Sequence, residues 1–475
     1  MLFSSNIFIF FFLPFVLLVY YTILRGSRDL RNLFLFLASL FFYAWGEPRF
    51  VLVMMGSIVL NWLIGLLIYK TRQGDESKSK TKTKALLIIA IICNLSIIFV
   101  FKYLMFTLEN IKFIFGIDSI TIPVIKLPIG ISFFTFQAMS YVIDVYRRDG
   151  RVQKNLINVG LYIAFFPQLI AGPIVRYNTI DKQINDRTES FDMFSDGVIR
   201  FIIGLSKKVI IANSMAVVAD YAFGVETEMS VLLAWLGAIA YTFQIYFDFS
   251  GYSDMAIGLG KMFGFEFLEN FNYPYISKSI TEFWRRWHMS LGTWFRDYLY
   301  IPLGGNRVSK GRHVFNLFIV WLCTGIWHGA NWTFVTWGLM YFVLLTFEKY
   351  SSFDTSEDRG KYDIPKHVYT MLLVILGWVV FRAESLGIAG AYIKAMAGAG
   401  VPLVNDGFLE YFRQIAVFIV IAIIGSTPWP KNVAGRIVGN RAGSAVGFVY
   451  LAIILLVAVS MIVKDTYNPF IYFNF

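Results

Sequence analysis

Two histidines stand among aromatic residues in stretches that are otherwise apolar. His288 lies in "FWRRWHMSLGTWFRDYLY", residues 283–300, and His328 lies in "CTGIWHGANW", residues 323–332. A neutral imidazole is a general base near pH 7, so it can take a proton from a hydroxyl that attacks an activated acyl group. The other two histidines, His313 and His367, stand beside loop charges, and we expect no role for them.

The apolar run 314–347 around His328 is too long for one membrane crossing. As a single helix it would be about 51 Å long, whereas the apolar core of a bilayer is about 30 Å thick. We predict a break at "TGIWHGANW", where Gly325 and Gly329 flank His328. Non-helical backbone at membrane depth is tolerated only inside protein or along a cavity. We therefore expect His328 to face an intramembrane cavity and to be functional. The alternative is a structural histidine.

The stretch around His288 has the pattern of one amphipathic helix. Placed on a helical wheel, residues 284–298 gather their aromatic side chains and His288 on one face, with Arg285 and Arg296 on another. Such a helix can lie at the membrane interface with its arginines toward the headgroups. That structural alternative explains the arginines, but it explains less well why His288 is the ionisable group on the aromatic face.

The composition predicts an all-α polytopic membrane protein with a single integral-membrane domain over residues 1–475. The chain is 57% hydrophobic and 15% charged, against about 25% charged residues in soluble domains. In a protein whose partner is membrane lipid, the net charge of +11 indicates basic cytoplasmic loops and not a nucleic-acid partner. The apolar spans expected are 7–24, 32–46, 50–69, 85–104, 128–146, 156–175, 197–219, 231–249, 314–347, 368–381, 386–398, 410–427 and 444–463, some of them re-entrant or interfacial.

Loop charges orient these spans. The N-terminal run lacks a positive region and a cleavage site, which is typical of a retained first span. Basic residues gather in 25–31, 71–84 and 147–154, while the loop between the second and third spans is nearly neutral. This alternation places the N-terminus outside. The basic loop 428–443 is then cytoplasmic, and the C-terminal tail lies outside.

Other motifs are missing, and the polar residues that remain have two interpretations. The sequence has no HExxH, GxSxG or Walker pattern and no third ligand for the two histidines, so neither a metal nor ATP is expected. In "QIYFDFSGYSD", Gln244, Asp248 and Asp254 are polar groups in an apolar region. They bind substrate, or they satisfy buried helix ends and arginines such as Arg285 or Arg296. Arg296–Asp297 can likewise be a structural ion pair.

Several blocks together resemble the membrane-bound O-acyltransferase family, and most of all its bacterial alginate O-acetylation branch. No single block is specific, but together they cover most of the chain. They are "LPIGISFFTFQAMSYVIDVYR" (127–147), "FFPQLIAGPIVRY" (165–177), "QIYFDFSGYSDMAIGLGKMFGF" (244–265), "NFNYPYISKSITEFWRRWHMSLGTWFRDYLYIPLGGNR" (270–307), "GIWHGANWTFVTWGLMY" (325–341) and the tail "NPFIYFNF".

The resemblance implies a fold of eleven or more helices around a central tunnel in the bacterial inner membrane. It implies His328 as the catalytic histidine and His288 as the second one. The donor would be a cytoplasmic acyl thioester, acetyl-coenzyme A or an acyl carrier protein, with no permanently bound cofactor. An extracytoplasmic SGNH-type acetyltransferase would complete O-acetylation of an envelope or secreted polysaccharide. Residues expected to contact substrate are Trp327, Asn331, Arg296, Asp297, Gln244 and Asp248.

Other functions remain open at this point. Within the family they are peptidoglycan O-acetylation and teichoic-acid D-alanylation, the latter less well matched by the blocks and the tail. Outside the family, a transporter or flippase of a lipid-linked sugar would also carry intramembrane polar residues. A transporter would not, however, require an imidazole beside a hydroxyl acceptor.

The tail "FIYFNF", residues 470–475, holds one nucleophile, Tyr472. The plain interpretation is an aromatic residue at the membrane interface. The alternative is that the tail folds back into the outer mouth of the tunnel, seated by Phe470 and Phe473. Tyr472 would take the acyl group and pass it on as a phenyl ester, which stays reactive because the pKa of tyrosine is only about 10.

Overall fold

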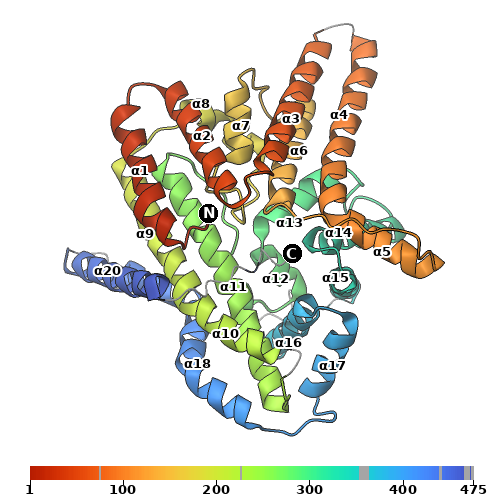
Figure 1. Cartoon of the computed structure of the whole chain (residues 1–475), viewed down its shortest axis with the longest axis vertical. Helices are drawn as coiled ribbons and strands as arrows, with labels where there is room; N and C mark the ends of the chain where they lie inside the picture. Colours follow the sequence, from red (N-terminus) through yellow and green to blue (C-terminus); the bar gives the residue numbers. More distant parts are fainter. Residues whose placement is uncertain are drawn as a thin grey trace. The chain divides into compact units, whose positions relative to one another are not determined.

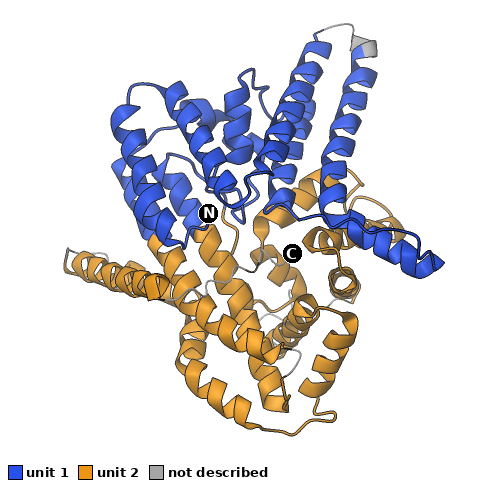
Figure 2. Cartoon of the chain, viewed as in Figure 1, with its two compact units in different colours: residues 1–201, 255–268 blue, residues 202–254, 269–475 orange. Residues whose placement is uncertain are grey.

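A computed structural model describes residues 1–73, 76–224, 227–351, 353, 363–437, 441–464 and 471. All the regular secondary structure in these residues is helical. The described chain divides into two compact units, residues 1–201 with 255–268 and residues 202–254 with 269–475 (Figure 2). Helices α9 and α11 contribute to both. The expectation of one domain over the whole chain stays a prediction.

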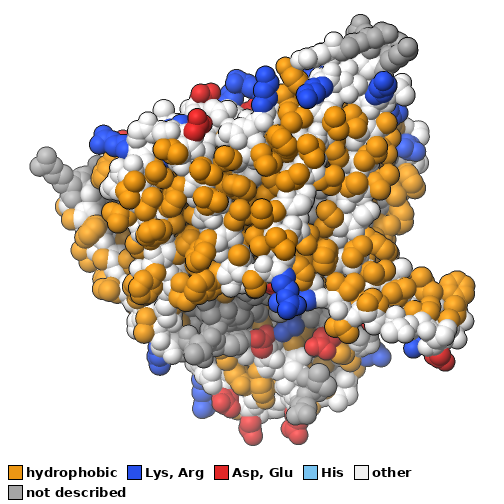
Figure 3. Space-filling view, turned by 45° about the horizontal axis from the view of Figure 1, so that its top comes forward, with side chains coloured by type: hydrophobic (Ala, Val, Ile, Leu, Met, Phe, Trp, Pro, Cys, Tyr) orange, Lys and Arg blue, Asp and Glu red, His pale blue; other side chains and the backbone are white. Residues whose placement is uncertain are grey.

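Seven helices of the described chain are long and apolar enough to cross a membrane. Hydrophobic side chains cover much of the face shown in Figure 3, as expected of a surface that contacts lipid. The predicted all-α polytopic fold is confirmed, although fewer helices meet these criteria than the eleven or more expected. The seven are Val51–Thr71, Ser79–Phe115, Phe191–Ala222, Val231–Met262, Asp363–Arg382, Asp406–Gly425 and Ala442–Lys464, with shorter apolar helices at Phe8–Ile23 and Leu386–Met396.

Unit 1 packs its helices around α6, which is buried from Ile131 to Val145. Helices α3, α4, α7 and α8 contact it. Three arginines, Arg28, Arg31 and Arg187, meet the carboxylate of Glu189, and they also donate to backbone carbonyls at helix ends. The elements are η1 (Phe8–Phe12), α1 (Leu13–Leu18), η2 (Val19–Ile23), α2 (Arg28–Gly46), α3 (Val51–Thr71), α4 (Glu76–Ile98), η3 (Phe99–Tyr103), α5 (Leu104–Phe115), α6 (Ile131–Arg147), α7 (Leu156–Ala164), α8 (Tyr177–Asp186) and α9 (Phe191–Ser206).

Unit 2 contains both stretches that hold the candidate histidines. Its helices α12 to α16 lie side by side (Figure 1). The elements are η4 (Lys207–Ala212), α10 (Asn213–Ala222), α11 (Val231–Met262), η5 (Pro274–Ile276), α12 (Ile280–Arg286), α13 (Met289–Phe295), η6 (Arg296–Tyr300), α14 (Lys310–His328), α15 (Trp332–Tyr350), α16 (Asp363–Arg382), α17 (Leu386–Met396), α18 (Asp406–Gly425), α19 (Trp429–Ile437) and α20 (Arg441–Lys464).

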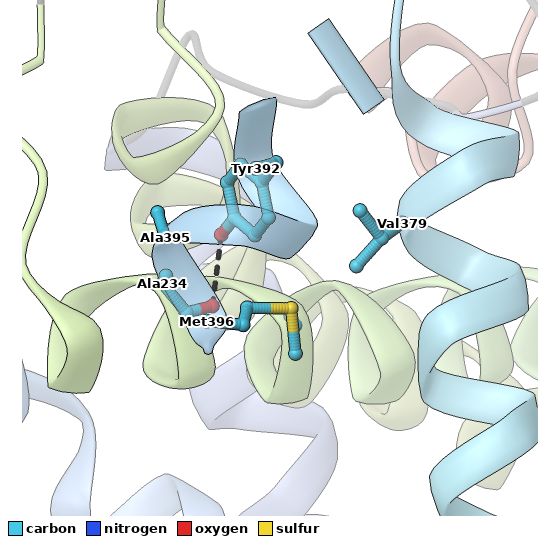
Figure 4. Packing of buried hydrophobic residues seen from close by; sticks show 6 residues of the cluster. Ala234, Val379, Tyr392, Ala395 and Met396 are labelled. Atoms are coloured by element: carbon cyan, nitrogen blue, oxygen red, sulfur yellow. Dashed lines mark hydrogen bonds between the residues drawn. The ribbon is translucent and has the colours of Figure 1, made fainter. Parts of the chain in front are cut away.

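A small apolar cluster joins α11, α16 and α17. Ala234 and Ala238 of α11 pack with Val379, Ala395 and Met396, and Tyr392 lies among them (Figure 4). The Tyr392 hydroxyl donates to the Ala234 carbonyl at 2.9 Å. This cluster holds α16 against the rest of the unit, and α16 carries an aromatic residue of the site.

Helices α14 and α15 form a hairpin whose backbones touch. A Cβ atom on Gly325 would lie 2.5 Å from the Phe334 carbonyl, and one on Gly338 would lie 2.5 Å from the Trp321 carbonyl. Small residues at helix contacts are the usual means of close packing within a membrane. The two glycines therefore set the position of the chain between the helices, where His328 lies.

A buried carboxylate ties α15 to α12. Glu348, near the end of α15, accepts from the backbone N–H of Ile280 at 2.7 Å and of Thr281 at 2.8 Å, and from the Thr281 hydroxyl at 2.7 Å. These N–H groups belong to the first turn of α12 and have no partner within the helix. A carboxylate is favoured there because the helix dipole is positive at this end. Glu348 thus fixes where α12 begins, eight residues before His288.

Gly338→Ala should destabilise the α14–α15 hairpin, because the added methyl group meets backbone atoms that cannot rotate away. Overpacking of this kind costs about 1–3 kcal/mol. We expect a lower midpoint of thermal aggregation in detergent. Gly311→Ala, in α14 with nothing within 4 Å of the added atom, is the control. Equal stability of the two variants would contradict the packing argument.

Candidate active site

His328 is the last residue of α14 and lies at the predicted break. Gly329 is extended, with φ −171° and ψ 160°, and α15 begins at Trp332. The side chain of His328 is buried. Its ring meets Trp327, Trp337 and Phe381, each at 5.1 Å between ring centres and each nearly edge to face. The prediction that the 314–347 run breaks at this histidine is confirmed.

Asn331 holds the start of α15. Its side-chain oxygen accepts from the backbone N–H of Thr333 at 3.1 Å, and its amide nitrogen donates to the Glu384 carbonyl at 2.8 Å. An asparagine at this position satisfies one of the free N–H groups of the first turn. Asn331 therefore shapes the break beside His328. Its expected contact with substrate stays a prediction.

The prediction of one helix over 284–298 is wrong, because the chain leaves helical geometry at His288. Helix α12 ends at Arg286, α13 begins at Met289, and His288 between them has φ 45° and ψ 49°. This left-handed conformation is unfavourable for a residue with a side chain and needs tertiary support. The support comes from residues 270–272: Asn272 N donates to the Arg286 carbonyl and Met289 N donates to the Asn270 carbonyl, each at 2.9 Å.

The His288 side chain is buried, so the interfacial anchor does not describe it. Its Nδ1 lies 3.2 Å from Asn270 Oδ1. Its ring packs edge to face on Phe249 of α11, with 4.7 Å between ring centres. Burial lowers the pKa of His288 to about 3 because it disfavours the charged ring. The imidazole is therefore neutral at physiological pH.

Trp327 brings the two histidines together within unit 2. Its ring lies 5.1 Å from the ring of His328 and 5.9 Å from that of His288. A second row of aromatic contacts runs from Phe381, which touches His328, through Trp378 to Trp287, the neighbour of His288. Two imidazoles from two separate breaks thus share one set of aromatic side chains. Such surroundings exclude water.

The carboxylates of α11 pair with lysines, not with the arginines expected from the sequence. Asp248 contacts Lys208 at 2.7 Å, both side chains being 2% exposed, and Asp254 contacts Lys207 at 2.7 Å. The structural alternative correctly predicted that these carboxylates pair with basic side chains. The partners that it named, Arg285 and Arg296, are wrong. Two buried charges without water need one another, because an unpaired one is costly.

Asp248 also binds Ile471, near the C-terminus. Its Oδ2 atom accepts from the backbone N–H of Ile471 at 2.9 Å, and Ile471 is buried. Tyr472 and the rest of the tail lie outside the described residues. A substrate-binding role for Asp248 stays a prediction.

The remaining residues expected to contact substrate, Arg296, Asp297 and Gln244, differ in their surroundings. Arg296 pairs with Asp297 at 2.7 Å and is 57% exposed, so this is a surface ion pair of adjacent residues. Gln244 is buried in α11, and its Oε1 atom finds no hydrogen-bond partner among the described residues. A buried amide oxygen of this kind is suited to bind a substrate donor. Among those residues, no three His, Cys, Asp or Glu side chains group as a metal site.

Sequence reasoning missed three supporting residues, namely Asn270, Lys208 and Glu348. Lys208 carried a usable signal, since a lysine inside the apolar run 197–219 must find a partner or a function. Asn270 and Glu348 carried none, because their partners lie far along the chain and polar residues in loops and helix ends are common.

Comparison with known proteins identifies the family of this chain. The family model of the membrane-bound O-acyltransferases matches residues 150–383, which include both histidines. The chain is 42% identical to a protein of Pseudomonas putida named a probable alginate O-acetylase, over the full length of both. It is 34% identical to a peptidoglycan O-acetyltransferase of Helicobacter pylori, with 100% of this chain and 98% of that protein covered. A teichoic acid D-alanyltransferase of Bacillus subtilis is 32% identical over 52% of this chain and 65% of its own length. The chain thus belongs to the membrane-bound O-acyltransferase family.

Proposed function

We propose that this multi-pass acyltransferase moves an acetyl group from a cytoplasmic thioester to a hydroxyl for O-acetylation of an alginate-like polysaccharide. The observation that carries the mechanism is the pairing of two buried imidazoles around Trp327, each at a break between helices. The acetyl group and the polymer are supported by the full-length similarity to the alginate O-acetylase of Pseudomonas putida.

His328 acts as the general base in this proposal. As the hydroxyl oxygen attacks the thioester carbon, its proton passes to the imidazole of His328. The carbon–sulfur bond then breaks, and the thiolate leaves and takes up a proton. His288 lies across Trp327 from His328 and contacts the substrate. In this proposal Gln244 and Trp327 are substrate contacts, and no permanently bound cofactor is involved.

The donor enters from the cytoplasm. Arg147 ends α6, and Arg148 and Arg151 follow it. All three are exposed, and they belong to a segment that the charge pattern assigns to the cytoplasmic side. Basic loops attract the phosphates of acetyl-coenzyme A or the acidic surface of an acyl carrier protein. In this proposal the N-terminus lies outside, and the chain lies in the bacterial inner membrane.

The C-terminal tail receives the acetyl group on the outer side. Support comes from Ile471, whose backbone binds Asp248, the residue before Phe249, which touches His288. Tyr472 follows Ile471 directly. In the proposed relay its phenol oxygen attacks the thioester and forms an aryl acetate, and its proton passes to His328. An extracytoplasmic SGNH-type acetyltransferase then moves the acetyl group to the polymer and regenerates the phenol.

Peptidoglycan O-acetylation is the second candidate, because the similarity to the Helicobacter pylori enzyme also spans the whole chain. D-alanylation is less well supported, since the match to the Bacillus subtilis enzyme covers about half of the chain. The acetyl chemistry is the same for both polysaccharides, so the acceptor is decided by which polymer loses acetate when the gene is deleted.

His328→Ala should abolish transfer while the protein still assembles in the membrane. Loss of a general base costs about 10²–10⁴-fold in rate. The measurement is acetate released from the polymer by mild base, with the protein quantified in membranes. The control is His367→Ala, whose ring contacts the Ser277 carbonyl, and it should keep near wild-type transfer. Normal acetylation by His328→Ala would eliminate the proposed base.

Tyr472→Phe should remove polymer acetylation, because the ring remains and only the nucleophilic hydroxyl is lost. Mass spectrometry of the wild-type C-terminal peptide should show an added acetyl group after incubation with the thioester. Tyr450→Phe, on the exposed face of α20, serves as the control. Full acetylation by the Tyr472 variant would contradict the relay and favour the interpretation of the tail as a membrane anchor.

The topology predicts opposite labelling of two cysteines introduced after Cys93 and Cys323 have been replaced. Gln73→Cys, at the end of α3, should react with a membrane-impermeant maleimide only from the cytoplasmic side. Asp118→Cys, after α5, should react only from outside. The reverse pattern would invert the orientation and with it the direction of transfer.

A further inference from the structure

Asn270 holds His288 through a set of hydrogen bonds that the sequence does not suggest. Its side-chain Oδ1 lies 3.2 Å from His288 Nδ1, 3.2 Å from Ser290 N and 2.9 Å from Ser290 Oγ. Its backbone carbonyl accepts from Met289 N at 2.9 Å. Asn270 is itself 1% exposed. One buried residue therefore contacts the histidine and the two residues that follow it.

The backbone decides which amide atom of Asn270 faces His288. The two ends of an asparagine amide are distinguished by their hydrogen-bond partners. Ser290 N–H can only donate, so the atom that it meets must be an acceptor, which is the amide oxygen and not the nitrogen. That same oxygen faces Nδ1 of His288. Since a carbonyl oxygen cannot donate, Nδ1 must carry the proton.

We infer that Asn270 is a positioning residue that fixes neutral His288 as its Nδ1–H tautomer, so that Nε2 is presented to the substrate as a hydrogen-bond acceptor. The inference rests on the acyl transfer proposed above for its catalytic meaning, but the tautomer itself does not depend on it. A neutral imidazole with the proton on one nitrogen has its lone pair on the other. Nε2 can then accept from a hydroxyl or N–H of the substrate. It cannot donate to the thioester oxygen.

An amide is the side chain suited to this task, because it orients the ring without charging it. A carboxylate in its place would stabilise the imidazolium, which donates from both nitrogens. Three charged side chains on neighbouring elements are paired: Arg286 of α12 with Glu282, Asp248 of α11 with Lys208, and Arg296 beyond α13 with Asp297. Arg285 of α12 and Glu269, the residue before Asn270, are exposed. Burial is therefore the physical cause that keeps His288 neutral.

The division of labour between the two histidines follows. His288 is held as an acceptor that orients the substrate, while His328 takes the proton. A wrong tautomer lowers the reaction rate strongly in such a site. In a serine protease it lowers kcat by about 10⁴-fold although the geometry is intact. Asn270→Ala should therefore lower transfer by about tenfold or more, with an acetyl thioester as the donor.

The tautomer can be observed directly, because the chain has only four histidines. Nitrogen-15 NMR of histidine-labelled protein distinguishes protonated from unprotonated ring nitrogens, and a His288→Gln sample assigns the signals of this residue. We expect Nδ1 protonated and Nε2 unprotonated from pH 6 to pH 8. A proton on Nε2 in the wild-type protein would overturn the inference whether or not the transfer mechanism is right.

Asn270→Asp gives the second test. The carboxylate raises the pKa of His288, so below the new pKa the ring is charged, Nε2 donates and transfer is lost. Above that pKa the neutral ring returns and transfer recovers, which adds a limb to the pH–rate profile. Asn306→Asp, the same change at an exposed position that the site does not use, should keep the wild-type profile. An Asn270→Asp profile of wild-type shape in a well-folded sample would refute the inference.

Different results would contradict the proposed base, His328, and the proposed role of Asn270. Full transfer by His328→Ala would remove the proposed base and leave the NMR result for His288 standing. A His288 signal with the opposite tautomer would remove the role of Asn270 and leave His328 as the base.

Discussion

Backbone that leaves helical geometry inside an apolar protein must find its hydrogen-bond partners in the protein, and the site depends on this constraint. Both histidines lie at such places. At the first break, the Asn270 side-chain oxygen accepts from Ser290 N, and the backbones of Asn270 and Asn272 bond to Met289 and Arg286. At the second, Asn331 caps α15 and donates to the Glu384 carbonyl. Each break is thus held by an asparagine, a neutral side chain that satisfies backbone groups without adding a charge to be buried.

Charge is used differently in the supporting structure. Buried carboxylates pair with lysines, as Asp248 does with Lys208, or accept from the first turn of a helix, as Glu348 does for α12. Removing one member of such a set would leave the other buried and uncompensated. These groups therefore fix positions more than they add stability. Glu348 and Asp248 place the helix before His288 and the residue before Tyr472.

The aromatic side chains serve both packing and chemistry. Trp327 touches both imidazoles, and Phe381 and Trp337 complete the surroundings of His328. They keep water away and keep His288 neutral. A neutral imidazole is the form that can accept a proton or a hydrogen bond. Ionisable groups stand among tryptophans here because the aromatic rings bury His288 and keep its imidazole in the neutral form.

The sequence by itself determined the all-helical membrane character, the break at His328 and the family. Apolar runs, a length limit and two glycines are local features, and a bilayer leaves the chain few ways to satisfy them. The break at His288 could not be predicted from the sequence, because residues 284–298 follow the helical period. The break is supported by backbone hydrogen bonds from residues 270–272, which lie outside that stretch. The lysine partners of Asp248 and Asp254 and the amide that orients His288 were also decided by tertiary structure. Contacts between residues far apart in the chain leave no periodic trace in one sequence, since they depend on how the helices pack.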